Sequence, residues 1–249
     1  AATLAARVRL ANAGQICVSP DYALVPRESV EAFVAEVQAA FARSFGSRVE
    51  GHHDYTAIVN ERQHARIVAL LDGARAKGAT VVACAEGGTG RQMPLHIVTG
   101  VTPEMRIAQE EIFGPILPVV AYDTLEQAIE HIRSGPRPLA LYAFGHDAAA
   151  RDQLLRHTHS GGVTINDWGW HVMNHDAPFG GVGNSGMGTY HGEEGFRELS
   201  HAKTVFQRHR FYPIGLFYPP YGNAVQRLVL KLWLGAGDPA LQPAPANKH

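Results

Sequence analysis

Apolar runs that alternate with amphipathic helical segments constrain the fold of this chain more than any other feature. Residues 116–122 (ILPVVAY) and 139–145 (LALYAFG) are nearly continuous apolar runs, which is typical of strands that are buried on both faces of a sheet. Residues 28–44 repeat apolar side chains at the helical spacing i, i+3, i+4 (Val30, Phe33, Val34, Val37, Phe41). Alternation of these two kinds of element predicts an α/β fold, a mostly parallel twisted sheet with helices on both faces.

The same patterns assign the remaining segments. We expect further helices at residues 1–11, 60–76, 124–133, 148–157, 192–199 and 224–234. We expect further strands at residues 21–26, 80–85, 96–101, 162–166 and 203–207. A Gly- and aromatic-rich loop is expected at 167–191, an extended arm at 211–222 and a disordered tail at 238–249. The predicted organisation is one domain over residues 1–210, which ends in a terminal strand, and a C-terminal arm, short helix and tail over 211–249.

Composition argues against several classes of partner. The formal net charge is -1, which gives no electrostatic footprint for nucleic acid. Two cysteines do not make a disulfide framework, so we expect a cytoplasmic location. We see no signal peptide and no apolar run that could span a bilayer. Residues 228–234 (LVLKLWL) are expected to cover a core or contact a second subunit rather than a membrane.

Because Ala1 is not Met and falls inside an expected helix, we expect a processed or partial sequence.

Cys17 follows a flexible run, Asn12-Ala13-Gly14-Gln15-Ile16, between a helical segment and a strand. A thiol on such a turn can reach a substrate and lie near backbone N–H groups, which are two requirements of acyl-transfer chemistry. From these residues alone, a small buried cysteine that closes the helix is an equal alternative. Cys84 lies in an apolar strand, where we expect a buried structural thiol.

Two further stretches stand out. Residues 110–115 (EEIFGP) could be a solvated helix end, but that interpretation does not explain the apolar, turn-forming Ile-Phe-Gly-Pro. Residues 178–188 (PFGGVGNSGMG) contain a formal GxGxxG from Gly181 to Gly186. We reject it as a dinucleotide fingerprint, because it does not directly follow a strand and lacks a following acidic ribose ligand.

These three motifs, in this order, resemble the signatures of the NAD(P)-dependent aldehyde dehydrogenase superfamily, in particular its class 3 and coniferyl-aldehyde branch. The resemblance covers residues 1–210 and, more loosely, the arm that follows. It implies the aldehyde dehydrogenase catalytic-domain fold and the oxidation of an aldehyde to the carboxylic acid with NAD or NADP (EC 1.2.1.-). The implied substrate is an aromatic aldehyde such as coniferyl aldehyde, or a medium- or long-chain aliphatic aldehyde.

The resemblance also implies a role for the motif around Cys17. The Cys17 thiolate would attack the aldehyde to give a thiohemiacetal, hydride would pass to the nicotinamide, and water would hydrolyse the thioester. The backbone N–H of Cys17 would donate to the oxyanion. Asn12, Gly14 and Gln15 match the pattern Asn-x-Gly-Gln-x-Cys around the nucleophile and would support the turn and the oxyanion site.

The other motifs are assigned in the same way. Glu111 would accept hydrogen bonds from the ribose hydroxyls, as a carboxylate can, and Phe113 would pack near the nicotinamide. Phe179 would lie near the nucleophile, in a loop over the substrate side. Asn166 with two tryptophans suits the walls of a substrate tunnel (Asn166, Trp168, Trp170), although ordinary packing of a long loop explains each of them equally well.

Part of the implied site does not occur in this sequence. The family carries its dinucleotide-binding domain, a Glu-Leu-Gly-Gly motif with the general base, and an oxyanion Asn before the nucleophile. We therefore expect the cofactor to be bound mainly by that absent domain, and the isolated chain to be inactive. The strand near Lys203–Gln207 resembles the family's subunit-contact strand and implies a homodimer or higher oligomer. Two alternatives stay open, a non-catalytic remnant that only oligomerises and a CoA-acylating aldehyde dehydrogenase.

The 14 histidines invite a metal hypothesis. His171 and His175 are four residues apart, and His157 and His159 are two apart. His171–His175 lacks the glutamate of HExxH and lies in a Gly/Pro-rich loop, so we expect no metal site.

Overall fold

The computed structural model describes residues 1–235. The chain divides into two compact units, Ala1–His201 and Ala202–His249, whereas the sequence places a boundary after residue 210. The disordered tail expected at 238–249 lies outside the described residues.

The first unit is built on a four-stranded sheet with the order β1-β4-β3-β2. Its strands are β1 (Ala23–Pro26), β2 (Thr80–Ala83), β3 (His96–Thr99) and β4 (Ile116–Tyr122). β4 pairs in parallel with β1 and with β3, and the edge strand β2 is antiparallel to β3. The mostly parallel sheet predicted from the apolar runs is confirmed.

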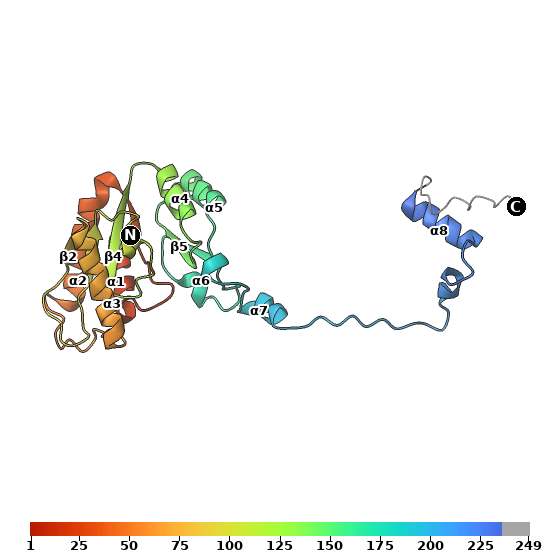
Figure 1. The fold of residues 1–249 in the computed structure, drawn as a ribbon, viewed down its shortest axis with the longest axis horizontal. Helices are drawn as coiled ribbons and strands as arrows, with labels where there is room; N and C mark the ends of the chain where they lie inside the picture. The colour runs from red at the N-terminus through yellow and green to blue at the C-terminus, as the bar shows by residue number, and fades with distance from the viewer. Residues whose placement is uncertain (236–249) are drawn as a thin grey trace. The chain divides into compact units, whose positions relative to one another are not determined.

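Helices cover both faces of this sheet (Figure 1). One face packs against α1 (Ala2–Leu10) and α2 (Val30–Phe45), and the other against α3 (Glu61–Ala76). Side chains alternate between the faces, as the period of a strand requires. In β3, Ile97 belongs to the cluster with α1 and α2, and Val98 to the cluster with α3.

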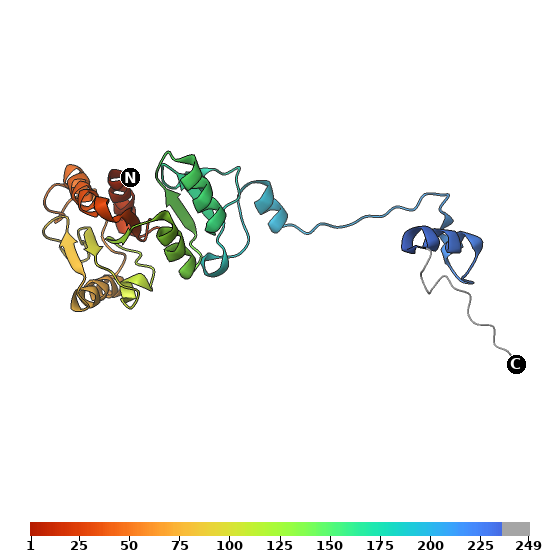
Figure 2. The ribbon, with the colours of Figure 1, turned by 90° about the horizontal axis from the view of Figure 1, so that it is seen from above.

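Two strands form a separate parallel sheet, β5 (Ala140–Ala143) with β6 (Gly162–Ile165). Beside them lie α4 (Leu125–Ser134) and α5 (Ala148–His157), as Figures 1 and 2 show. Three side chains from the two helices form the centre of this region (Ile129, Ile132, Leu154). Leu24 of β1 packs against the same cluster and joins the two sheets. The strands therefore divide into two hydrogen-bonded sheets, where the sequence suggested one.

Shorter elements connect these layers. The 3-10 helices are η1 (Ala11–Gly14), η2 (Arg27–Ser29), η3 (Arg106–Ala108), η4 (Gly183–Ser185) and η5 (Pro213–Phe217). After β6 come α6 (Trp170–Met173) and α7 (Gly192–Glu198). The loop expected at 167–191 therefore contains α6 and η4. A bridge closes the second half of this loop, where Phe179 and Tyr190 exchange two backbone hydrogen bonds of 2.8 Å.

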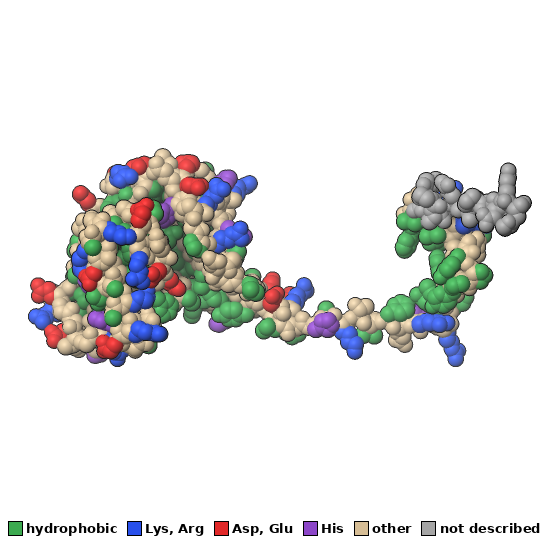
Figure 3. All heavy atoms as spheres, in the orientation of Figure 1, with side chains coloured by type: hydrophobic (Ala, Val, Ile, Leu, Met, Phe, Trp, Pro, Cys, Tyr) green, Lys and Arg blue, Asp and Glu red, His purple; other side chains and the backbone are tan. Residues whose placement is uncertain are grey.

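The second unit contains η5 and α8 (Ala224–Leu234). The strand expected at 203–207 does not form within the single chain, because these residues pair with no strand among residues 1–235, and its role as a subunit contact stays a prediction. A strand needs a backbone partner for its N–H and C=O groups. Several apolar side chains of α8 are exposed (Leu228, Leu232, Trp233, Leu234), and green side chains gather there in Figure 3. None of the helices in residues 1–235 is long and apolar enough to cross a membrane.

Candidate active site

The turn that carries Cys17 begins where α1 stops being helical. Residues 12–14, within η1, all have positive φ, at 50°, 54° and 74°, which ends the right-handed helix. The Ser19 N–H then donates to the Ile16 carbonyl at 2.9 Å, so that Cys17 lies at the tip of a tight turn. Cys17 is exposed.

Asn12 and Gln15 hold this turn through the backbone. The Asn12 side-chain amide donates to the Gln15 carbonyl at 3.1 Å, and Gln15 Nε2 donates to the Asn12 carbonyl at 2.9 Å. Gln15 also reaches a second segment, where Nε2 donates to the Ala57 carbonyl at 3.2 Å and Oε1 accepts the Val59 N–H at 2.9 Å. Gln15 therefore ties the cysteine turn to the segment before α3.

Gly14 brings the turn against the second sequence motif. A Cβ added at Gly14 would collide with the carbonyl oxygen of Gly114. A Cβ at Gly114 would in turn collide with the Ile67 side chain of α3. Close approach of two backbones is a use of glycine that other residues cannot meet. The turn with Cys17 and the segment 110–115 are therefore neighbours, although about a hundred residues separate them.

Arg9 is a buried residue that no motif in the sequence marks. Its side chain is 1% exposed, in the last turn of α1. Nε donates to the Ile116 carbonyl at 2.7 Å, and Nη1 donates to the Pro20 carbonyl at 3.0 Å and to Ser19 Oγ at 3.3 Å. Nη2 lies 3.5 Å from Asp21 Oδ1. The guanidinium therefore anchors the residues just after Cys17 to the start of β4.

Asp21 continues this network into the 110–115 segment. Its Oδ1 accepts the backbone N–H of Ile112 at 3.0 Å. Burial raises the pKa of Asp21, and the charge of Arg9 and the Ile112 N–H oppose that shift. From α3, Arg66 donates to the carbonyls of Glu111 and Ile112. The segment is thus fixed through its backbone, which leaves the Glu111 side chain free of the anchoring contacts.

Glu111 and Phe113 are both exposed on this fixed segment. Partial burial of the carboxyl group and the negative charge of Asp21 raise the pKa of Glu111, and the charges of Arg9 and Arg66 oppose the shift. Phe113 has a positive φ of 49° and is 39% exposed. The arrangement presents a hydrogen-bond acceptor and an aromatic ring at the surface, beside the cysteine turn.

The second sheet contacts the cysteine turn through two side chains. Tyr142 Oη and Trp168 Nε1 each donate to the carbonyl of Val18, both at 2.8 Å. Burial raises the pKa of Tyr142, and the Cys17 thiolate adds to the shift. Trp168 is one of the residues expected in a tunnel wall, whereas Tyr142 could not be found from the sequence, because a tyrosine in an apolar strand gives no signal by itself.

Asn166 closes the end of the second sheet. Its N–H donates to the Ala143 carbonyl at 2.7 Å, and its side-chain amide bonds both the N–H and the carbonyl of Gly145, at 2.7 and 3.0 Å. Its φ is 58°. Asp167 follows and accepts the Trp168 N–H at 2.8 Å and Trp170 Nε1 at 2.7 Å. Asn166 and Asp167 therefore shape the loop that delivers Trp168 to the cysteine turn.

The other two residues that the resemblance places on the substrate side differ in burial. Trp170 is 62% exposed, whereas Phe179 is 7% exposed. The Phe179 ring lies 6.1 Å from that of His171 and 6.0 Å from that of His191. The His171 ring is also 6.0 Å from that of Tyr142. The His171 ring thus connects Phe179 to Tyr142, whose phenol donates to the Val18 carbonyl.

Two histidines in this region carry buried nitrogens without a partner among the described residues, at His171 Nε2 and His191 Nδ1. Burial lowers the pKa of His171, whose Nδ1 is 2.7 Å from Thr164 Oγ1. His175, four residues after His171, meets His191 edge-on, with ring centroids 4.8 Å apart and an interplanar angle of 61°.

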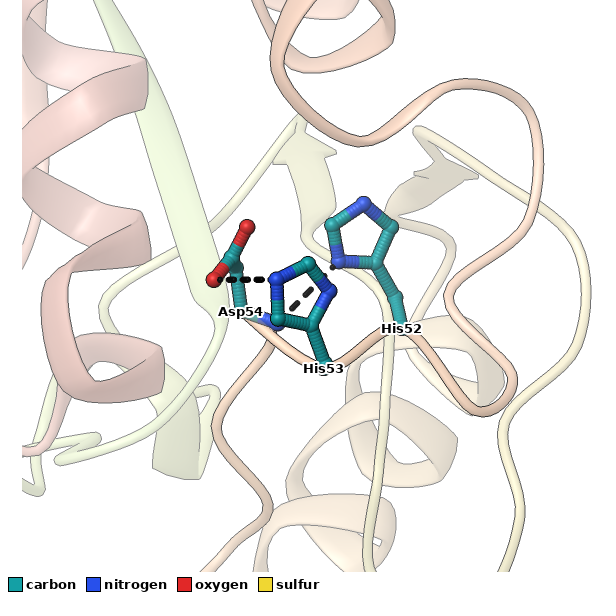
Figure 4. Close-up of side chains that lie close together, drawn as sticks. All are labelled: His52, His53 and Asp54. Atoms are coloured by element: carbon teal, nitrogen blue, oxygen red, sulfur yellow. Dashed lines mark hydrogen bonds and ion pairs between the residues drawn. The ribbon is translucent and has the colours of Figure 1, made fainter.

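Another cluster, His52, His53 and Asp54, lies in the loop after α2 (Figure 4). His53 Nε2 is 3.1 Å from Asp54 Oδ1, and His52 Nδ1 accepts the Asp54 N–H at 3.3 Å. The two imidazoles stack at 5.6 Å with an interplanar angle of 10°. Lone pairs lie in the ring planes, so two stacked, nearly parallel rings do not direct them at one point, as a zinc site requires. The cluster is a pair of stacked imidazoles with one His53–Asp54 contact, in which His53 and Asp54 are exposed and His52 is half-buried.

The Asn12–Cys17 turn, the 110–115 segment and the Phe179 loop thus lie within one unit, and the first two are in contact. The sequence model that describes the aldehyde dehydrogenase family matches residues 1–205. The chain belongs to the aldehyde dehydrogenase family.

Individual relatives agree with this family. A probable coniferyl aldehyde dehydrogenase of Pseudomonas aeruginosa is 50% identical over 223 residues, which are 90% of this chain and 47% of that protein. A dimeric NADP-preferring aldehyde dehydrogenase sequence of Bos taurus is 38% identical over 79% of this chain and 81% of its own length. The substrate-bound structure of Staphylococcus aureus AldH matches with a TM-score of 0.82 and 33% identity, over 94% of this chain and 50% of that one. The chain spans about half the length of the Pseudomonas and Staphylococcus proteins.

Proposed function

We propose that this chain is the nucleophile-bearing part of an enzyme that oxidises an aldehyde to the carboxylic acid with NAD or NADP. The observation that carries the proposal is the contact between the cysteine turn and the 110–115 segment. Gly14 abuts Gly114, and the Arg9–Asp21 pair links the residues after Cys17 to the Ile112 N–H. A thiol nucleophile and an exposed carboxylate are thereby held on two rigidly joined loops.

Cys17 is the proposed nucleophile. Its thiol is exposed at the tip of the turn, where an aldehyde carbon can approach. The Cys17 N–H donates to no acceptor within residues 1–235, so it is free to donate to the oxygen that becomes negative when the thiolate adds to the carbonyl. Asn12, Gly14 and Gln15 support the turn through the contacts described above.

Glu111 and Phe113 are the proposed cofactor contacts. A carboxylate accepts two hydrogen bonds from a ribose diol, and the exposed Phe113 ring offers a face to a flat heterocycle. The residues present therefore fit the nicotinamide half of a dinucleotide. When bound, the cofactor supplies the acceptor for the hydride. Both NAD and NADP stay open, since the relative from Bos taurus is NADP-preferring and the remaining cofactor contacts belong to sequence that this chain does not contain.

The proposed substrate is an aromatic aldehyde, coniferyl aldehyde in the first instance, with medium- or long-chain aliphatic aldehydes as the second choice. The 50% identity to a probable coniferyl aldehyde dehydrogenase supports this order. Asn166, Trp168, Trp170 and Phe179 are the proposed substrate-side residues. Of these, Trp168 has a direct hydrogen bond to the cysteine turn, and Trp170 is the most exposed tryptophan of the first unit.

Three further expectations belong to this proposal. The 249 residues alone should turn over poorly, because they contain no Glu-Leu-Gly-Gly base motif. Residues 203–207 are the proposed subunit contact, through pairing with a second copy. The two free cysteines are consistent with a cytoplasmic location.

Two alternatives are separated from this proposal. A non-catalytic remnant is disfavoured because it has no physical need for an exposed Cys17 beside Glu111. A CoA-acylating activity is distinguished by product analysis with and without CoA.

Site-specific alkylation tests the proposal on the chain itself. Iodoacetamide at pH 7.5, read by peptide mass spectrometry, should label Cys17 well before Cys84, and Cys17→Ser should abolish the fast phase. Benzaldehyde should slow labelling of Cys17 by forming a thiohemiacetal. Labelling of Cys84 first, or no protection by the aldehyde, would contradict the assignment of Cys17.

A further inference from the structure

We infer that Tyr142 and Trp168 are positioning residues, which clamp the peptide between Val18 and Ser19 and thereby aim the Cys17 N–H at the reacting oxygen. The inference rests on the proposed function of Cys17. It differs from a role for Trp168 as a tunnel wall, because it assigns the indole N–H, and the phenol of Tyr142, to the nucleophile turn.

The first argument is convergence on one atom. The Val18 carbonyl oxygen accepts from Tyr142 Oη and from Trp168 Nε1, each at 2.8 Å. A carbonyl oxygen has two lone pairs, so both acceptor positions of Val18 are filled by side chains. The donors come from different segments, β5 and the loop after β6, and they lie 124 and 150 residues from Val18 in sequence.

The second argument is what this clamp fixes. The peptide between Val18 and Ser19 is held at its oxygen by the two side chains and at its nitrogen by the bond from the Ser19 N–H to the Ile16 carbonyl. With both ends of this peptide fixed, the turn over residues 16–19 has one arrangement. Among the backbone N–H groups of this turn that have no partner within residues 1–235, the Cys17 N–H is the one on the residue that carries the thiol.

The third argument concerns the supports of the two donors. Burial raises the pKa of Tyr142, so the phenol keeps the proton that it donates across the neutral range. Trp168 is held by Asp167 through its backbone N–H, and Asn166 fixes the start of that loop on Gly145. Each donor is therefore preorganised before it meets Val18, as a positioning residue must be.

The matched control is Tyr55. Its phenol is buried, where that of Tyr142 is half-buried, and it too donates to a backbone carbonyl, that of Met93, at 2.7 Å. It belongs to the core under α2 rather than to the cysteine turn. Tyr55→Phe removes a bond of the same kind as Tyr142→Phe, and so separates loss of stability from loss of positioning.

The experiment compares Tyr142→Phe, Trp168→Phe, the double variant and Tyr55→Phe in the whole chain. Two quantities are measured at Cys17 across a range of pH: the second-order rate of alkylation by iodoacetamide, and the protection that benzaldehyde gives against it. Alkylation requires only an accessible thiolate. Aldehyde addition also requires a donor at the oxyanion.

Each single variant leaves one donor on the Val18 carbonyl. We expect the protection of Cys17 by benzaldehyde to weaken by less than about threefold in each, in keeping with the loss of one modest hydrogen bond. The double variant frees the carbonyl, and we expect protection to weaken by about tenfold or more, since loss of an oxyanion donor typically costs more than that. Alkylation should change little in all four proteins, and Tyr55→Phe should retain full protection.

A double variant that keeps the wild-type protection, or a Tyr55→Phe variant that loses as much, would overturn the inference. If benzaldehyde fails to protect the wild-type chain, the proposed function fails instead. Hydrogen exchange of the Ser19 amide then tests whether Tyr142 and Trp168 hold the Val18–Ser19 peptide. We expect it to be faster in the double variant, and an unchanged rate would refute the inference. Should the double variant not fold, the same amide is compared in the two single variants and Tyr55→Phe.

Discussion

Removal of the Asp21 carboxylate should destabilise this chain through a charge that loses its partner. Arg9 is 1% exposed and Asp21 is 35% exposed by side chain, with 3.5 Å between Nη2 and Oδ1. Breaking a buried ion pair by deleting one member costs about 3–5 kcal/mol. Because the Asp21 side chain is partly exposed, water can enter its place. We therefore expect Asp21→Ala to lower the free energy of unfolding by about 3 kcal/mol, at the low end of that range.

Asp21→Ala also leaves the Ile112 N–H without its acceptor, because this N–H donates to the same oxygen, Asp21 Oδ1. Asp21→Asn keeps an acceptor oxygen in that place and removes only the charge, so it should cost less than Asp21→Ala. The double variant Arg9→Met/Asp21→Ala removes the buried charge together with its partner, and should recover part of the stability lost in Asp21→Ala.

Urea unfolding followed by tryptophan fluorescence measures these differences. With a slope of about 2–3 kcal/mol/M, a loss of about 3 kcal/mol lowers the midpoint by about 1–1.5 M. Asp123→Ala is the control, because Asp123 forms an exposed bidentate pair with Arg27, at 2.6 and 2.9 Å. Exposed pairs contribute little, so its midpoint should not move measurably. An Asp21→Ala midpoint equal to that of the wild type, or a double variant less stable than either single variant, would refute the reasoning.

Three other predictions concern single residues. Burial raises the pKa of Cys84 to about 12, so at pH 8.5 only about one molecule in three thousand carries the thiolate there. Peptide mass spectrometry should therefore find Cys84 alkylated only after urea unfolding, and fast labelling of the folded chain would contradict this. Gly14→Ala places a Cβ at a φ of 74° and against the Gly114 carbonyl, and should cost more than about 2 kcal/mol in urea unfolding, with a smaller loss arguing that the loops can separate. Asn60→Ala removes the cap that accepts the Gln63 N–H at 2.9 Å and should cost about 1 kcal/mol, and an unchanged midpoint would show that the cap is dispensable.

The regular elements of the first unit follow from local patterns in the sequence. Val37 and Phe41 are fully buried, and their spacing alone places α2 within two residues at its start and one at its end. Periodicity succeeds here because burial on one side of a helix or strand is what the pattern records. It does not decide residues 203–207, where apolar and β-branched residues suggest a strand but no strand partner lies within residues 1–235.

The site is predictable only where a motif marks it. The Asn-x-Gly-Gln-x-Cys turn and the 110–115 segment were singled out, and the structure brings them into contact, while their chemical roles stay predictions. Arg9 and Tyr142 were missed because each acts on a distant backbone carbonyl. The Arg9 bond to Ile116 spans 107 residues, and the Tyr142 bond to Val18 spans 124. Neither contact leaves a pattern in the neighbouring sequence.

The strained backbone before Cys17 has a reason in this geometry. Ala13 has a φ of 54°, a left-handed conformation that costs an ordinary residue about 1–2 kcal/mol and persists only where the surroundings over-determine it. Here the surroundings are Gln15 bonded to residues 57–59, Arg9 bonded to the segment after Cys17, and the two donors on Val18. Had α1 continued as a helix, the Cys17 N–H would have bonded the Ala13 carbonyl four residues earlier. The left-handed residues break that ladder, so the strain leaves the N–H beside the thiol unbonded within residues 1–235, as the proposed oxyanion role of Cys17 requires.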